Sequence, residues 1–177
     1  MNSQQILNSI KKIPTLKKTF KGVFARNTIP NFIVNNIKKS FGFIVNLDKN
    51  TQQGSHWIAI FVPAKKNFIE YFDSFGRKPQ YSKIKLFLNK RKYLKYNNIK
   101  LQSVTNTTCG QYCLFYLACR VFYISFKKII SFFNKCNFEY NDYLVNEIIN
   151  KLFHTKHKIS DPQFILAQIH KISKQYG

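Results

Sequence analysis

One cysteine of the chain lies in a setting that favours nucleophilic chemistry. Cys109 follows a polar run that ends in Thr107 and Thr108, and it precedes Gly110 and an apolar stretch that continues to about Ile124. This pattern predicts a buried helix that begins at Cys109, with one of the threonines as its cap. The free backbone N–H groups and the positive end of the helix dipole favour a thiolate there. A thiolate attacks carbonyl carbons, and Gly110 leaves room for a substrate backbone beside it.

A cysteine nucleophile also needs a base. Among the four histidines, His56 is the best candidate, because it lies where a polar loop enters an apolar strand. The others lie in the lysine-rich C-terminal part, where a solvated surface is the simpler interpretation and no partner completes a metal site: His154, His157 and His170. Without a base, Cys109 would be one more small buried residue, as free cysteines often are.

The base in turn needs a group that orients it, and we expect Asp73 in this role. Residues 56–62 and 68–73 predict the two strands of a hairpin, in which the end of one strand lies next to the start of the other. Glu70 is mid-strand, and alternation places it on the opposite face. Asp73 can then accept the imidazole N–H and support the charged ring, although an aspartate here is also typical of a turn.

Acyl transfer requires donors for the oxyanion that develops on the carbonyl. The backbone N–H of Cys109 at the start of the helix is one. Residues 98–104 alternate like a strand that leads to this helix, so the side-chain amide of Gln102 can be the second, with an exposed strand residue as the alternative. Trp57, beside the histidine, either walls the site or packs in the core.

The elements that must position these residues form an α+β fold. We expect one domain over residues 1–177, with a small mixed sheet of four or five strands packed against the central cysteine helix. Residues 20–27 read as a loop. Helices are predicted over 3–12, 31–38, 82–94, within 126–153 and over 162–172, and strands over 41–47, 56–62, 68–73 and 98–104.

Composition narrows the class of protein. A hydrophobic content of 45% argues against disorder. No apolar run approaches the roughly 20 residues that span a bilayer, and the N-terminus lacks the layout of a signal peptide. We therefore expect a soluble protein, made in a reducing compartment, with its four cysteines as thiols.

The net charge of +22, from 29 Lys and Arg against 7 Asp and Glu, suits contact with a polyanion such as DNA. Arginine is scarce, so we expect no reading of the base sequence. The alternative is that the lysines reflect an AT-rich coding sequence and are merely solvated surface.

Several segments together resemble the adenovirus-type (adenain-like) cysteine proteases, whose fold is shared with the proteases that process SUMO. They are, in chain order, Gly54-Ser55-His56-Trp57, Phe72-Asp73-Ser74-Phe75-Gly76, Gln102 and Cys109-Gly110. Residues 22–30 also resemble the N-terminal segment of the viral branch. The order histidine, acid, glutamine, cysteine makes the match specific, since papain-like enzymes have the order cysteine, histidine, asparagine.

The resemblance assigns roles to these residues. It implies His56 as general base, Cys109 as nucleophile and Gln102 as oxyanion donor, with Trp57 and Gly110 lining a narrow substrate channel. Asp73 would hold the histidine; the adenovirus enzymes have glutamate there, and aspartate is usual in the SUMO-processing branch. No metal or other cofactor is expected.

The function implied is a cysteine endopeptidase that cleaves viral capsid or virion precursor proteins, after small glycine-rich sequences, during particle maturation. The resemblance also implies activation by DNA and by a disulfide-linked viral peptide, for which Cys136 and Cys119 are the open alternatives. We expect a monomer without membrane contact, located in the virion and the viral factory of the host cell. Two alternatives remain: a deconjugating protease for a ubiquitin-like modifier, and a non-enzymatic basic protein that packages nucleic acid.

Overall fold

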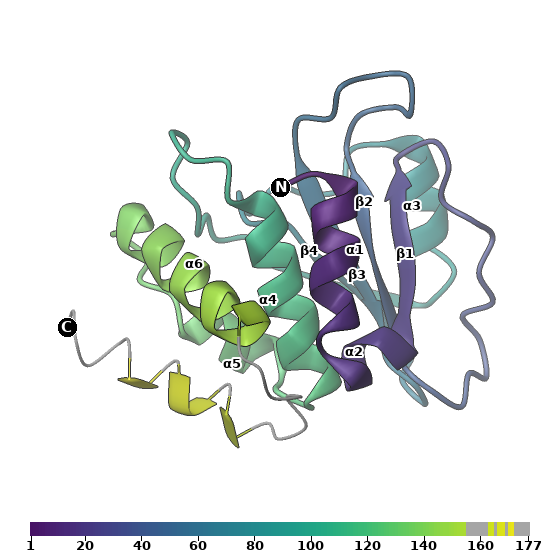
Figure 1. Cartoon of the computed structure of the whole chain (residues 1–177). Coiled ribbons are helices and arrows are strands. Elements are labelled where there is room, and N and C mark those ends of the chain that lie inside the picture. Colours follow the sequence, from purple (N-terminus) through teal and green to yellow (C-terminus); the bar gives the residue numbers. More distant parts are fainter. Residues whose placement is uncertain (155–162, 165, 169, 172–177) are drawn as a thin grey trace.

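The computed structural model describes residues 1–154, 163–164, 166–168 and 170–171, and it contains a mixed sheet of five strands. The strands lie side by side in chain order (Figure 1): β1 (Phe20–Ala25), β2 (Phe41–Asn46), β3 (Trp57–Val62), β4 (Phe68–Phe72) and β5 (Tyr93–Tyr96). The two outer pairs are parallel, and β3 is antiparallel to both of its neighbours. The predicted α+β class with a small mixed sheet is confirmed.

Helix α4 (Cys109–Val121) is the centre of the fold. It packs on β3 across one face of the sheet, and α6 (Phe138–His154) packs against α4 (Figure 1). Nearly every side chain of α4 is buried, as expected for a helix that is hydrophobic all round. The same side of the sheet carries α1 (Ser3–Lys11), α2 (Pro14–Thr19) and α5 (Phe126–Ser131). The cysteine helix is therefore central, as predicted.

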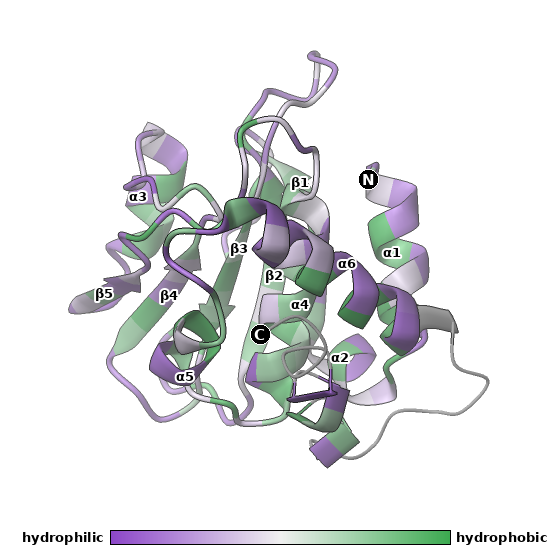
Figure 2. Cartoon of the chain, turned by 90° about the vertical axis from the view of Figure 1, so that its left-hand side faces the viewer, coloured by the Kyte–Doolittle hydropathy of each residue, from purple (hydrophilic) through white to green (hydrophobic). Residues whose placement is uncertain are grey.

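The opposite face of the sheet has its own, smaller core. Helix α3 (Ser82–Leu88) covers it, and the Phe87 ring meets the Phe43 ring edge to face with 5.2 Å between centroids. Figure 2 shows hydrophobic residues concentrated in the strands and α4, and hydrophilic residues on the outer sides of the surface helices. The sheet is thus buried on both faces, so the hairpin β3–β4 is held rigidly.

Two predictions for the N-terminal part are wrong. Residues 20–27 contain strand β1 rather than a loop, because their backbone pairs in parallel with β2, across a register shift beside Gly22 at φ 135°. Residues 31–38 form an irregular segment with a turn at 35–36 rather than a helix. Pro14 begins the short helix α2, which agrees with the preference of proline for the first turn.

Two predictions in the middle of the chain are also wrong. The helix expected over 82–94 ends at Leu88, and its last part belongs to β5, which pairs in parallel with β4. Residues 98–104 are a loop and not a strand, because the N–H groups of Leu101 and Gln102 both donate to the carbonyl of Ser74. Gln102 therefore lies on a loop.

The helical structure predicted within 126–153 is confirmed, and it consists of two helices, α5 and α6. Of the helix predicted over 162–172, the structure describes residues 163–164, 166–168 and 170–171, and all of these are helical. None of the helices in the described part of the chain has the length and hydropathy needed to span a bilayer.

A buried ion pair joins the C-terminal part of α4 to the sheet. Glu70 on β4 is 1% exposed and accepts from the Tyr116 hydroxyl at 2.6 Å and from Arg120 Nε at 2.6 Å. The Arg120 guanidinium also lies over the Phe61 ring, 4.7 Å from its centroid. Glu70 thus faces α4, where it fixes the position of the helix relative to β4.

This pair gives a stability prediction. Arg120→Met keeps most of the side-chain volume but leaves the Glu70 carboxylate buried without its cation. We expect the free energy of unfolding to fall by about 3–5 kcal/mol, measured by urea denaturation with the fluorescence of the single tryptophan. The control is Lys151→Met, which breaks the half-exposed Lys151–Glu147 contact at 3.9 Å and should have a much smaller effect. Equal losses in the two variants would contradict the prediction.

Candidate active site

Cys109 is the first residue of α4 and is almost fully buried. Thr108 is the N-cap residue, but its side chain makes no capping hydrogen bond and its hydroxyl donates to Asp142 instead. Thr108 therefore occupies the predicted N-cap position, but its hydroxyl does not accept a hydrogen bond from the backbone of the helix. The first N–H groups of a helix have no partner within it, so this helix end offers donors and a positive dipole end to the sulfur.

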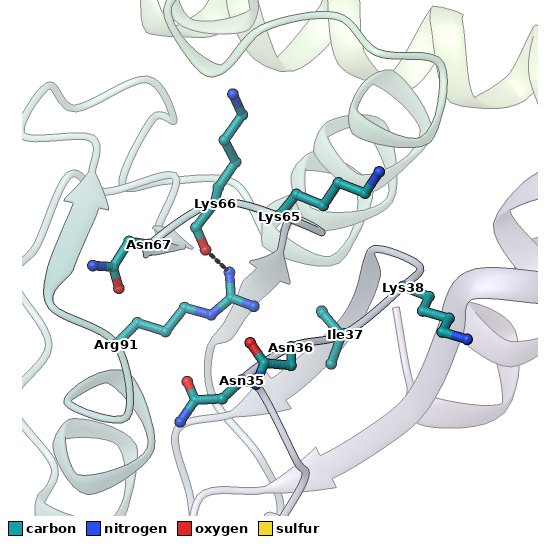
Figure 3. Close-up of a pocket in the computed structure, with 8 residues that line it drawn as sticks. All are labelled: Asn35, Asn36, Ile37, Lys38, Lys65, Lys66, Asn67 and Arg91. Carbon is teal, nitrogen blue, oxygen red and sulfur yellow. Dashed lines mark hydrogen bonds between the residues drawn. The ribbon is translucent and has the colours of Figure 1, made fainter.

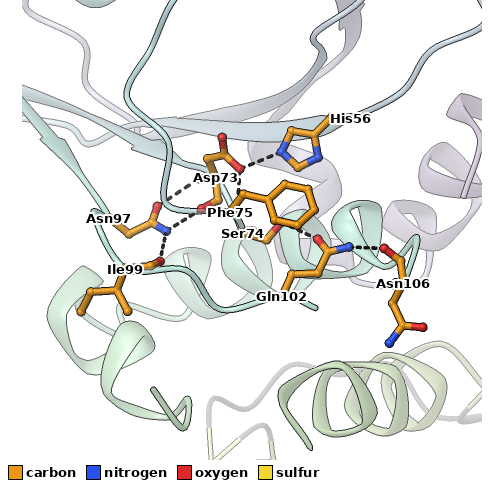
Figure 4. Close-up of polar contacts among 8 residues, drawn as sticks. All are labelled: His56, Asp73, Ser74, Phe75, Asn97, Ile99, Gln102 and Asn106. Atoms are coloured by element: carbon orange, nitrogen blue, oxygen red, sulfur yellow. Dashed lines mark hydrogen bonds and ion pairs between the residues drawn. The ribbon is translucent and has the colours of Figure 1, made fainter. Parts of the chain in front are cut away.

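His56 and Asp73 meet at one end of the β3–β4 hairpin. His56 directly precedes β3 and Asp73 directly follows β4, and the antiparallel register brings them together. Nε2 of His56 lies 2.7 Å from Oδ1 of Asp73 (Figure 4), and both residues are buried. A carboxylate there accepts the imidazole N–H, which fixes the ring orientation and leaves Nδ1 free for other chemistry.

Neighbouring groups hold Asp73 in place. The Asn97 side chain accepts from the Asp73 N–H and donates to its carbonyl (Figure 4). The Phe75 N–H donates to Asp73 Oδ1 at 2.9 Å, and the Phe75 ring packs on the imidazole with 4.8 Å between centroids. The carboxylate and the ring it orients are thus both fixed by their surroundings.

The imidazole and the thiol influence one another. Burial by itself lowers the pKa of His56, but the hydrogen bond and charge of Asp73, with a contribution from Cys109, raise that pKa to about 9. Burial by itself raises the pKa of Cys109, but His56 and the backbone N–H groups of Trp57 and Gly110 outweigh it and lower the pKa. Within the described residues, Nδ1 of His56 has no hydrogen-bond partner at normal geometry. The arrangement favours a thiolate–imidazolium pair whose contact is looser than a completed hydrogen bond, as is common before substrate binds.

Gln102 is buried and its amide is fixed at both ends. Its Oε1 accepts from the Ser74 hydroxyl at 2.7 Å, and its Nε2 donates to the Asn106 carbonyl at 2.7 Å (Figure 4). An amide group has two N–H bonds on its nitrogen, so one remains for a substrate oxygen. The loop position of Gln102 thus suits an oxyanion donor, and the alternative of an exposed strand residue is wrong.

The two residues predicted to line the channel are neighbours, and the start of the chain lies against both. A Cβ placed on Gly110 would be 3.5 Å from Trp57 Cδ1 and 3.1 Å from the Met1 Cβ. Trp57 Nε1 donates to the Met1 carbonyl at 3.1 Å. A cavity of about 620 Å³ opens beside Trp57, between the start of α1, β1 and residues 46–54. A peptide that approaches Gly110 therefore has to share this space with Met1 or displace it.

The other histidines and cysteines make no hydrogen bond or ion pair with His56 or Asp73 among the described side chains. Nothing is described for the side chain of His154. His157 is outside the described residues, and His170 is exposed. All four cysteines are free; Cys119 is buried, whereas Cys136 is exposed. No group of three potential metal ligands occurs within the part of the chain that the structure describes.

Four residues of the site were missed by the sequence analysis as contributors: Ser74, Asn97, Asn106 and Asp142. Asn97 follows β5 directly, and the parallel register that pairs Tyr71 with Tyr96 places it beside Asp73. Asp142 continues the apolar stripe of α6, whose buried members include Val145 and Ile149. A polar residue on an otherwise buried helix face needs a partner, and this signal could have identified Asp142.

The pKa shifts predict how pH acts on the reactivity of Cys109. In Asp73→Asn the His56 pKa falls, because its anionic partner is lost, and the Cys109 pKa rises as the imidazolium becomes less stable. The pH range in which thiolate and imidazolium coexist should therefore narrow from both sides. Rates of Cys109 alkylation and of peptide hydrolysis across pH measure this.

The matched control is Asp48→Asn, which removes one acid from a loop at the same end of the hairpin and should leave both limbs of the profile unchanged. A profile of Asp73→Asn that matches the wild type would show that this carboxylate does not set the pKa of the imidazole.

Comparison with known proteins gives similarity to viral cysteine proteases, although no family model matches the chain. The chain is 37% identical over 103 aligned positions to the SUMO-1 cysteine protease of African swine fever virus, Warthog/Namibia isolate, and equally to the cysteine protease of the Badajoz strain. Each alignment covers 52% of this chain and 38% of the relative. The chain thus matches about two fifths of the length of these relatives.

Solved structures agree with the sequence comparison. A crystal structure of the African swine fever virus protease, with selenomethionine, superposes with a TM-score of 0.50 at 28% identity and covers 66% of this chain and 45% of the other. A second one has a TM-score of 0.50 at 22% identity, covers 77% and 60%, and supports the fold alone. Sequence similarity and fold together confirm the resemblance to viral cysteine proteases with the adenain-like fold.

Proposed function

We propose that this protein is a cysteine endopeptidase. The observation that carries the proposal is the buried arrangement of Cys109 at a helix start, with His56 close enough to lower its pKa and Asp73 bonded to His56 at 2.7 Å. The Cys109 thiolate attacks the scissile carbonyl carbon. The oxyanion that forms accepts hydrogen bonds from the backbone N–H groups at the start of α4 and from the side-chain amide of Gln102. The imidazolium of His56 protonates the leaving amine. Water, deprotonated by His56, then hydrolyses the thioester and regenerates the thiol.

The substrates we propose are capsid or other virion precursor proteins of the same virus, cut after small glycine-rich sequences in the virion and viral factory. The similarity to proteases of African swine fever virus supports a viral setting. The close approach of Trp57 to Gly110 supports the preference for small residues, because little space is left for a substrate side chain.

Purified protein incubated with capsid precursor proteins of the same genome should cleave them, and Cys109→Ala should abolish cleavage. His56→Ala should lower kcat/KM by at least about 100-fold, since general-base catalysis typically contributes about 10²–10⁴-fold. Cys136→Ser alters an exposed cysteine and should retain the full activity of the wild type when both are assayed without an added activating peptide. Product bands and their N-terminal sequences give the readout, and cleavage that persists in Cys109→Ala would reject the assignment.

A deconjugating protease for a ubiquitin-like modifier is the second candidate. Two observations favour it: some relatives carry the name SUMO-1 cysteine protease, and the acid beside His56 is an aspartate. The same preparation, treated with a SUMO or ubiquitin probe that carries a C-terminal propargyl group, separates the candidates. Labelling of Cys109 by the modifier probe, without cleavage of capsid precursors, would favour deconjugation.

We further propose that DNA contacts the protein without sequence specificity, at the end of the sheet opposite the active site. Residues 1–47 and 74–138 contain no Asp or Glu. A pocket of about 700 Å³ lies at the β3–β4 turn and is lined mostly by cationic and amide side chains (Figure 3): Asn35, Asn36, Ile37, Lys38, Lys65, Lys66, Asn67 and Arg91. Among the described residues, no carboxylate forms an ion pair with these lysines.

The geometry of this pocket suits a polyanion better than a small ion. Arg91 is buried and donates to the carbonyls of Val34, Pro63 and Lys66, so it holds the floor of the pocket. The side chains of Lys38, Lys65 and Lys66 spread outward from the rim in Figure 3. A strand of six residues is about 20 Å long, so DNA bound there leaves the active site open to a peptide.

Removing these three rim charges should weaken DNA binding and its dependence on salt. The variant combines Lys38→Gln, Lys66→Gln and Lys65→Asn, since asparagine tolerates the positive φ of 55° at that position. Fluorescence anisotropy with duplex DNA should show the slope of log K against log salt reduced by about 2–3, one counterion for each lost phosphate contact.

The control variant combines Lys17→Gln, Lys18→Gln and Lys127→Gln on α2 and α5, which removes the same charge elsewhere. If the two triple variants weaken DNA binding equally, the pocket at the β3–β4 turn is not the DNA site. If the wild type binds no DNA at about 50 mM salt, the proposal of DNA as a partner is wrong.

A further inference from the structure

The loop 101–108 sets the distance between the amide of Gln102 and the nucleophile. Gln102 lies at its beginning, and Thr108 at its end directly precedes Cys109. This loop has no regular secondary structure, so side chains have to define its shape. The group that defines the loop also defines the oxyanion site.

Asp142 on α6 holds this loop at three points. Its Oδ2 accepts from the Ser103 N–H at 3.2 Å and from Asn106 Nδ2 at 2.7 Å, and its Oδ1 accepts from the Thr108 hydroxyl at 2.9 Å. Asp142 is 2% exposed, and no cation of the described residues forms an ion pair with it. A buried carboxylate that bonds only neutral donors needs each of them, so it constrains the loop strongly.

The carboxylate also reaches Gln102 through Asn106. The Asn106 side chain is held by Asp142, while the Asn106 carbonyl accepts from Gln102 Nε2 at 2.7 Å. Figure 4 shows the chain of contacts from Ser74 through Gln102 to Asn106. Asp142 therefore acts on both sides of the site: on the oxyanion donor through Asn106, and on the start of α4 through Thr108.

We propose that Asp142 is a positioning residue for the oxyanion site, an inference that rests on the proposed peptidase activity. It touches neither substrate nor the reacting atoms. Other contacts anchor the beginning of the loop, because the Leu101 carbonyl accepts from the Tyr112 hydroxyl and from Asn141 Nδ2. The loss of Asp142 should thus shift residues 103–108 without detaching the whole segment.

The test variant is Asp142→Asn, which keeps the size of the side chain. An amide offers one acceptor oxygen and one donor nitrogen, so it can bond Thr108 but presents N–H groups to the donors of Ser103 and Asn106. The control is Glu139→Gln, one turn earlier on α6. Glu139 is exposed, and its carboxylate accepts from the Ser103 hydroxyl at 2.9 Å and from its own backbone N–H. The side-chain oxygen of glutamine can accept both bonds, so this variant removes the same charge without loosening the loop.

Three measurements separate positioning from general destabilisation. We expect Asp142→Asn to lower kcat by about 100-fold, the cost of a misplacement of about 1 Å, with KM changed less than about 3-fold. A peptide aldehyde, whose thiohemiacetal oxygen occupies the oxyanion site, should lose affinity by a similar factor. Alkylation of Cys109 by iodoacetamide needs no oxyanion donor and should stay within about 2-fold of wild type. Glu139→Gln should match the wild type in all three.

Parallel losses of alkylation and aldehyde affinity, or a lower melting temperature with unchanged kcat, would reject the positioning role. Asn106→Ala in the Asp142→Asn background should add little, because both changes break the same contact, and fully additive losses would also reject it. Amide hydrogen exchange of Ser103 gives a readout that does not require activity. Faster exchange in Asp142→Asn would support the loop constraint even in a protein that cleaves no peptide, and unchanged exchange would reject it.

Discussion

The contact between His56 and Asp73 is the interaction on which the rest of the structure depends. A charged imidazole in a buried site is unfavourable unless an anion compensates it, and the 2.7 Å contact to Asp73 provides that compensation. The two residues lie 17 positions apart, on opposite arms of a hairpin, so only the pairing register can bring them together. Burial of β3 and β4 on both faces fixes that register, because a slip by one residue would reverse every side chain. The pairing register of β3 and β4 thus determines that the hydrogen bond between His56 and Asp73 can form.

The central helix has to stay in register with this hairpin, and buried acids fix it near both ends. Glu70 bonds Arg120 and Tyr116 near the C-terminal end of α4, and Asp142 bonds the residue that precedes Cys109. Hydrophobic contacts are not directional, so burial alone does not set the rotation of a helix that is apolar on all sides. Polar contacts are directional, so these acids give the sulfur a defined position opposite the imidazole.

Local pattern was enough to predict the parts of the site that lie on regular elements. The hairpin with Asp73 near His56 follows from alternation and chain order, and the start of α4 follows from the break between polar and apolar residues. The errors concern contacts distant in sequence: β1 and β5 pair in parallel with strands reached by long connections, and no local signal marks such pairing. Residues 98–104 alternate like a strand, yet their backbone donors turn to Ser74. Asn97 meets Asp73 only because β5 pairs with β4. Asp142 meets the loop 101–108 only because α6 packs against α4.

The use of acids inside the protein also accounts for part of its surface charge. Of the seven acids in the sequence, Glu70, Asp73 and Asp142 are buried and bonded to other groups. Glu70 pairs with Arg120 and Asp73 with His56, and Asp142 is buried away from the surface lysines, so few carboxylates remain to pair with those lysines. The field outside the molecule is therefore strongly positive, while the field within the site is set by Asp73. These two roles are compatible because the β3–β4 hairpin presents His56 at one end and its lysine-rich turn at the other. The lysines of the turn lie about 20 Å from the imidazole, the length of a six-residue strand, and this exceeds the Debye length of about 8 Å at physiological salt, so solvent largely screens their charges from His56.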